Sequence, residues 1–202
     1  MQMKTEKQLN ALIYAIEKYS AIGRTKLMKF VFLVDLFRFN QCGDTLLEDE
    51  YIRLPNGPVP DIGYSYSDNE NAYLGVACRV IDPERYQYQY TPRKKFEKSL
   101  FKDEDLKLFD AVIDTLKSHN TKSISDLTHR FRLWKEAENS DIITKDKLKL
   151  DEYEFDELEA FVYFGQSVKK AGELEEYPEP DFEDPIPDKM LNLQFEAMER
   201  AD

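Results

Sequence analysis

The sequence predicts a mainly helical α+β fold, in which a compact helical domain carries a small antiparallel β-hairpin or three-stranded sheet and is followed by an extended acidic C-terminal tail. Apolar residues recur at helical spacing along most of the chain, and one stretch alternates tyrosine with glutamine, as a strand does. After Gly172, prolines alternate with acidic residues, which is typical of an extended linker. We therefore expect a helical domain over residues 1–172 and a tail over residues 173–202.

Two helices are predicted at the start of the chain. The first is amphipathic, because its apolar residues follow the i, i+3, i+4, i+7 pattern: Leu9, Leu12, Ile13 and Ile16. The second runs from Thr25 to about Asn40 and is apolar almost all round, which predicts a helix buried on most faces at the centre of the fold. Gly43 is placed to terminate it.

Residues 51–60 contain three prolines and one glycine, a composition that excludes a helix and predicts turns. A short strand over residues 51–54 leads into this turn. Its rigid tip either faces a partner protein or is a structural corner whose Gly57 supplies an unusual φ. Arg53 beside it suits a carboxylate or phosphate as well as an ordinary ion pair. We expect residues 61–75 to form a loop with one helical turn.

A β-hairpin is predicted from Gly75–Ile81 and Tyr86–Tyr90, with its turn at residues 82–85. Tyr86, Tyr88 and Tyr90 share one face of the second strand, because side chains alternate along a strand. This face is either a recognition surface or cross-strand packing, and the sequence leaves both interpretations open.

The rest of the domain reads as helical. One helix carries its apolar residues over 106–116, and another over 155–168. Between them, Ser123 and Asp126 resemble a capping box that opens a helix with an apolar stripe of Leu127, Phe131 and Trp134. His129 lies five residues before Trp134, about 140° around a helix, so we expect the two side chains to lie on different faces.

The chain is acidic, with 40 acidic and 28 basic side chains and a net charge of −12. This charge argues against nucleic-acid binding and favours a protein partner with a basic surface. Residues 173–202 hold 11 acidic side chains against Lys189 and Arg200. The acidic composition of this tail is typical of a solubilising end. Its apolar stripe of Leu191, Phe195 and Met198 favours instead an arm that docks in cis or on the partner.

Other classes of function leave no signal in the sequence. Cys42 and Cys78 are too few for a disulfide framework, and with two histidines they do not suggest a metal site. No phosphate-binding loop or nucleophile motif is present, so we expect no cofactor and no enzymatic activity. The absence of a signal sequence or a long apolar run predicts a cytoplasmic protein.

Three stretches together resemble the Panacea domain of the SocA-like antitoxin family. They are Lys26-Leu-Met-Lys-Phe-Val-Phe-Leu-Val-Asp35 followed by Cys42-Gly-Asp-Thr-Leu46, the strand and turn Tyr51-Ile-Arg-Leu-Pro-Asn-Gly-Pro-Val-Pro60, and Leu127-Thr-His-Arg-Phe-Arg-Leu-Trp134. The similarity covers roughly residues 7–165. Two features depart from the family: residues 61–67 look less helical than the usual continuation, and the acidic tail lies outside the pattern.

The resemblance implies an antitoxin that binds and neutralises a partner toxin by direct contact. It implies structural roles for Lys29, Asp35, His129 and Trp134. Predicted partner contacts come from the turn, the tyrosine strand and the tail, namely Arg53, Asn56, Gly57, Pro58, Val59, Tyr86, Tyr88, Tyr90, Leu191, Phe195 and Met198. Alternatives are an adaptor that delivers the toxin to a protease, a regulator of its own promoter, and a phage accessory binding protein.

Overall fold

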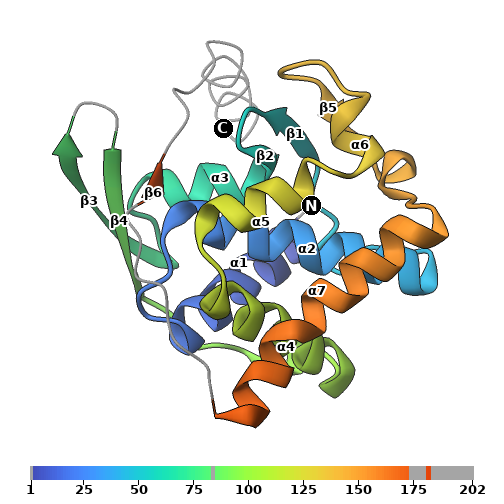
Figure 1. The fold of residues 1–202 in the computed structure, drawn as a ribbon. Coiled ribbons are helices and arrows are strands. Elements are labelled where there is room, and N and C mark those ends of the chain that lie inside the picture. Colours follow the sequence, from blue (N-terminus) through green and yellow to red (C-terminus); the bar gives the residue numbers. More distant parts are fainter. Residues whose placement is uncertain (1, 83–84, 173–180, 183–202) are drawn as a thin grey trace.

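Helix α2 (Arg24–Cys42) runs through the centre of the molecule, and the other elements surround it (Figure 1). Every residue from Lys26 to Phe37 is buried, as predicted from a helix that is apolar on almost every side. The helix ends at Gly43, whose left-handed backbone (φ 81°) lets its N–H donate to the carbonyl of Phe39 at 2.7 Å. Glycine adopts this conformation without steric cost, so the predicted end of the helix is confirmed.

The computed structural model describes residues 2–82, 85–172 and 181–182. Helices predominate, so the predicted mainly helical α+β class is confirmed. The elements besides α2 are α1 (Gln2–Lys18), β1 (Tyr51–Leu54), β2 (Gly57–Pro60), α3 (Asp61–Asp68), β3 (Leu74–Asp82), β4 (Arg85–Pro92), η1 (Lys98–Leu100), α4 (Asp103–Ser118), α5 (Thr121–Thr128), α6 (Arg132–Lys135), β5 (Ile142–Ile143), η2 (Lys145–Leu148), α7 (Glu152–Ala171) and β6 (Asp181–Phe182).

Helices α4 and α7 pack closely together beside α2. Gly165 of α7 is buried at this crossing, and its N–H donates to Thr115 Oγ1 at 3.0 Å. The same hydroxyl donates to the carbonyl of Val162 at 2.8 Å. A threonine that bonds the backbone of its neighbour, opposite a residue without a side chain, lets two helix backbones approach closely.

No described helix combines the length and the apolar character that a membrane span requires.

The strands form two small antiparallel sheets. In the first, β1 lies between β2 and β5, and Arg53 pairs with Pro58. Two prolines are tolerated in β2 because it is an edge strand, where a missing N–H breaks no ladder. In the second sheet, β4 lies between β3 and β6. The predicted hairpin of β3 and β4 is confirmed. Of the predicted tail, only β6 is described; Leu191, Phe195 and Met198 lie outside the described residues.

The predicted loop over residues 61–75 is wrong in its first half, where α3 forms. The helix begins after Pro60, and Asp49 Oδ2 accepts the N–H of Gly63 at 3.2 Å in its first turn. A carboxylate at this position accepts a hydrogen bond from a backbone N–H that has no partner within the helix, and it interacts favourably with the positive end of the helix dipole. Tyr64 and Ser67 are buried against the core. The expected departure from the family's helical continuation is therefore wrong as well.

The helix predicted to run through Trp134 is broken in two. Helix α5 starts at Thr121, where Asn120 rather than Ser123 provides the cap by accepting the N–H of Ser123 at 2.8 Å. It ends at Thr128, and α6 starts again after Phe131, whose backbone is extended. Phe131 is fully buried at this break. The chain changes direction where this ring enters the core. The spacing of apolar residues does not predict such a break, because it depends on contacts with distant parts of the chain.

Candidate functional site

The turn between β1 and β2 rests on a buried lysine. Gly57 has φ 109°, and a Cβ at this position would lie 2.0 Å from Lys29 Nζ and 2.6 Å from Thr128 Oγ1. Lys29 is buried, and its ammonium donates to Thr128 Oγ1 at 3.3 Å. Only glycine combines this backbone conformation with so close an approach. The turn is therefore fixed to α2 and α5 from below.

Asp35, also on α2, fixes the chain that leads into β1. Its carboxylate is fully buried, and Oδ1 accepts the N–H groups of Leu46 at 2.8 Å and Leu47 at 2.6 Å. Oδ2 accepts the Tyr51 hydroxyl at 2.8 Å and the N–H of Asp49 at 3.3 Å. Burial raises the pKa of Asp35, whereas these four donors act to lower it. Asp35 thus holds the 44–50 segment and the start of the hairpin in place.

Next to the hairpin that Lys29 and Asp35 hold in place, three side chains form a stack: Arg53, Trp134 and His129. The Arg53 guanidinium lies 4.0 Å from the centre of the Trp134 ring, and the centres of the His129 and Trp134 rings are 3.9 Å apart with an interplanar angle of 19°. Trp134 Nε1 donates to the Leu54 carbonyl at 3.2 Å. Arg53 Nη1 donates to Asn139 Oδ1 at 3.4 Å. The expectation that His129 and Trp134 lie on different faces is wrong, because the helix between them is broken.

The backbone of Arg53 is held as firmly as its side chain. Its N–H donates to the Asp141 carbonyl at 2.9 Å, and its carbonyl accepts the N–H of Ser140 at 2.9 Å. These bonds continue the pairing of β1 with β5. A half-buried arginine with both its backbone and its guanidinium fixed has little side-chain entropy left to lose on binding.

The surroundings of His129 favour the neutral form of its ring. Burial lowers its pKa, and the positive charges of Lys29 and Arg53 act in the same direction. Asp126 and a hydrogen bond with the backbone of Pro55 oppose the change. Because the ordinary pKa of histidine is about 6.5, the lowered value leaves the ring neutral at physiological pH. A neutral ring stacks on the indole without an unpaired charge.

The structure separates the predicted contact residues of the turn into two groups. Arg53, Asn56 and Val59 are half-buried and border on solvent. Gly57 and Pro58 are buried. Gly57 lies against Lys29 and Pro58 is buried in β2, so a partner contact by these two residues stays a prediction that their burial does not favour.

The tyrosine strand packs against a buried arginine that sequence reasoning missed. Arg24 donates to the Tyr88 hydroxyl at 3.0 Å and pairs with Asp68 at 3.0 Å. Its guanidinium also lies 3.7 Å from the centre of the Tyr64 ring. Tyr90 is buried and stacks on Tyr88 with ring centres 6.2 Å apart. The Tyr90 ring is part of the core, so its partner contact stays a prediction that this burial does not favour.

The side chain of Tyr86 lies outside the described part of the structure, although its backbone pairs in β4. No local signal distinguished Arg24, because α2 also carries the charged residues Lys26, Lys29, Asp35 and Arg38. A buried guanidinium needs several partners, and hydroxyl-bearing rings can supply them.

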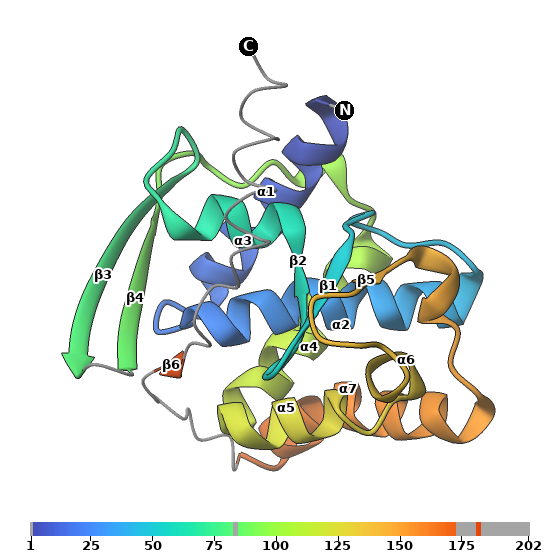
Figure 2. The same ribbon diagram turned by 90° about the horizontal axis from the view of Figure 1, so that it is seen from above.

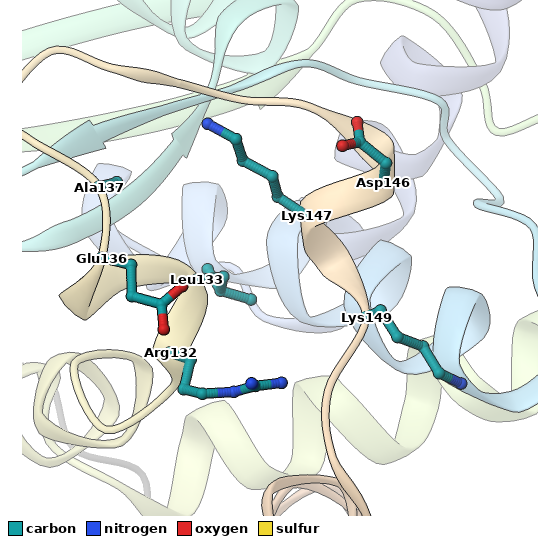
Figure 3. A pocket seen from close by; sticks show the side chains of 7 residues that line it. All are labelled: Arg132, Leu133, Glu136, Ala137, Asp146, Lys147 and Lys149. Atoms are coloured by element: carbon teal, nitrogen blue, oxygen red, sulfur yellow. The ribbon is translucent and has the colours of Figure 1, made fainter.

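A hollow of about 300 Å³ lies between α6 and η2 (Figure 3). Three basic side chains line it, but Figure 3 shows Lys147 and Lys149 extending in different directions. Arg132 is directed to carboxylates of α7, with Nε 3.6 Å from Glu154 Oε2. The cations do not converge, so this hollow offers no cradle for an anion. Among the described residues, no group of three metal-ligating side chains comes together.

Replacing Gly57 with alanine is expected to lower the free energy of unfolding by about 3 kcal/mol, because a positive φ and displacement of the buried Lys29 ammonium act together. Gly43→Ala is the matched control, since Gly43 also has a positive φ but has open space around its Cβ position. That control is expected to lose only about 1 kcal/mol. Urea unfolding followed by circular dichroism measures both, and equal losses would show that the contact with Lys29 contributes nothing.

Comparison with known proteins identifies a family for most of the residues described above. Residues 27–135 match the sequence model described as antitoxin SocA-like, Panacea domain, and this range is more than half of the chain. It includes Lys29, Asp35, Gly57 and the whole Arg53–Trp134–His129 stack. Neither the curated proteins nor the solved structures contain a match. Because the match covers more than half of the chain, the chain belongs to the SocA-like antitoxin family and contains its Panacea domain.

Proposed function

We propose that this protein is the antitoxin of a toxin–antitoxin pair and neutralises its partner toxin by direct protein–protein contact. Membership of an antitoxin family implies a toxin partner. The observation that carries the proposed mode of action is the Arg53–Trp134–His129 stack, which holds an arginine and a tryptophan rigidly beside solvent. Arginine and tryptophan are enriched among the residues that dominate binding energy at protein interfaces.

The charge of the chain supports a basic toxin surface. A net charge of −12 attracts a basic partner over several ångströms and speeds their encounter. Arg53 then provides a local exception, because its planar guanidinium pairs with a carboxylate on the partner. We propose that binding itself blocks the toxin and that no step is catalysed, since His129 is engaged in the stack.

The test is to express the neighbouring reading frame in a bacterial host with and without this chain. Growth arrest by the neighbouring product alone, with rescue and co-purification when the chain is present, is the expected result. Arg53→Ala is expected to weaken binding about tenfold or more in calorimetry with the purified toxin. Arg79→Ala is the matched control, because Arg79 is an exposed arginine on β3, away from the stack.

Two outcomes would contradict the proposal. Toxicity without rescue or complex formation would remove direct neutralisation. A toxin level that falls at constant synthesis whenever the chain is present would instead show delivery to a protease, because simple blocking leaves the amount of toxin unchanged.

A further inference from the structure

The outer face of α7 carries large apolar side chains that the fold leaves in contact with solvent. Three of the four large hydrophobic residues that are exposed in the described part of the chain belong to α7: Tyr153 at 79%, Tyr163 at 39% and Phe164 at 46%. At 100° per residue, these side chains lie on one side of the helix together with Asp156 and Ala160. Apolar groups gathered on one exposed face are typical of an interaction site.

A groove of about 320 Å³ lies beside this face, between α5 and α7. Its lining is largely apolar, with Leu127 from α5 and Ala160, Phe161 and Phe164 from α7. The His119 ring closes one end, 4.7 Å from the centre of the Phe161 ring and 4.9 Å from that of Phe164. The groove is large enough for one large apolar side chain, and burial there would remove Phe164 from water.

One carboxylate lines the groove, and two more lie on the exposed surface of α7. Asp156 and Glu159 are exposed on α7. Glu157 lines the groove and pairs with Arg130, which joins α7 to the end of α5. Among these residues the acidic charge exceeds the basic charge. An apolar groove next to a helix surface with exposed carboxylates fits a segment that presents an apolar side chain between lysine or arginine residues.

This face has a second distinguishing property, its place in the sequence. The family match ends at residue 135, whereas α7 begins at Glu152. The Arg53–Trp134–His129 stack therefore lies in the part shared with the family, and the outer face of α7 lies outside it. Figure 2 shows α5, α6 and α7 along the same side of the molecule. One partner can thus contact the stack and the groove together.

We propose that the outer face of α7 and the α5–α7 groove bind the cognate toxin and select it, through a toxin segment that places one large apolar side chain in the groove and basic side chains against Asp156 and Glu159. The proposal rests on the proposed antitoxin function and adds the surface that distinguishes this toxin from others. The stack then supplies binding energy common to the family, and α7 supplies contacts specific to this chain.

The test uses the full-length chain and the purified product of the neighbouring reading frame. Phe164→Ser removes the apolar wall of the groove and is expected to weaken toxin binding about 30-fold or more, the size typical of an interface hot spot. Glu159→Lys reverses an exposed charge and is expected to reduce the association rate, with the difference shrinking at high salt. Glu17→Lys on α1 is the matched control and leaves the association rate close to the wild-type value.

The measurements separate this proposal from the proposed function. If the wild-type chain binds and neutralises the toxin while Phe164→Ser and Glu159→Lys bind it as tightly and as fast, the α7 surface is overturned and the antitoxin function stands. If the wild-type chain itself does not bind the toxin, the antitoxin function is overturned and the α7 surface with it. Because Glu159 is exposed, its reversal keeps the test valid even if Phe164→Ser impairs folding.

Discussion

Replacing Gly165 with alanine is expected to lower the free energy of unfolding by about 4 kcal/mol or more, and to leave little folded protein at 37 °C. A Cβ on Gly165 would lie 2.2 Å from the carbonyl carbon of Asp114 and 2.2 Å from the nitrogen of Thr115. These are backbone atoms of α4, which cannot rotate away as a side chain can. The helices would have to separate, and Thr115 would lose its hydrogen bonds to α7.

A loss of stability in Gly165→Ala would show close packing of α4 and α7, because the same exchange in an exposed helix has the opposite effect. In the interior of an exposed helix, exchanging glycine for alanine stabilises by up to about 1 kcal/mol, because alanine restricts the unfolded chain. Gly172→Ala is the control for a glycine with open space around it, and its positive φ alone accounts for a loss of about 1 kcal/mol. Urea unfolding followed by circular dichroism compares the two variants. A loss below 1 kcal/mol for Gly165→Ala would mean that α4 and α7 are farther apart in solution.

Replacing Asp35 with alanine is expected to lower the free energy of unfolding by about 4 kcal/mol. The change leaves the N–H groups of Leu46, Leu47 and Asp49 and the Tyr51 hydroxyl without their acceptor in the protein interior. Each orphaned donor costs about 1–3 kcal/mol, and partial relaxation keeps the total below the sum.

Two further variants identify the cause of the Asp35 effect. Asp35→Asn keeps one acceptor oxygen and is expected to lose about half as much as Asp35→Ala. Tyr51→Phe removes one donor with its bond and is expected to lose about 1 kcal/mol. Thermal unfolding at neutral pH measures all three. If Asp35→Ala lost less than Tyr51→Phe, the carboxylate would not be what holds the 44–50 segment.

The helices and strands that were predicted best are those that a local sequence pattern determines. The period of apolar residues in α1, α4 and α7 is set by the helix itself, and the alternation in β4 is set by the strand. Gly43 ends α2 because one residue must adopt a left-handed backbone there. These signals are local, so a sequence read without a structure contains them.

The elements missed depend on residues far along the chain. The first turn of α3 is capped by the side chain of Asp49, which lies 14 residues earlier in the chain than Gly63. Helix α5 ends at Thr128, and the chain after it turns so that Phe131 enters the core. The candidate site was predicted only in part for the same reason. The motif residues Lys29, Gly57 and His129 were identified, but the contact of Gly57 with Lys29 and the stacking of Arg53 on Trp134 join distant segments. The α7 groove left no motif, although its exposed aromatic residues could be read from the helical period.

The contact of the β1–β2 turn with Lys29 and Thr128 has a consequence for how the chain folds. Lys29 and Thr128 are 99 positions apart, so their contact closes a long loop and is expected to form late. During synthesis, a chain that ends before His129 has the hairpin and its arginine but neither the imidazole nor the indole, and the stack is complete only once Trp134 has been added. The proposed binding surface therefore becomes active only after about two thirds of the protein has left the ribosome, and a nascent chain shorter than this cannot yet hold the toxin through it.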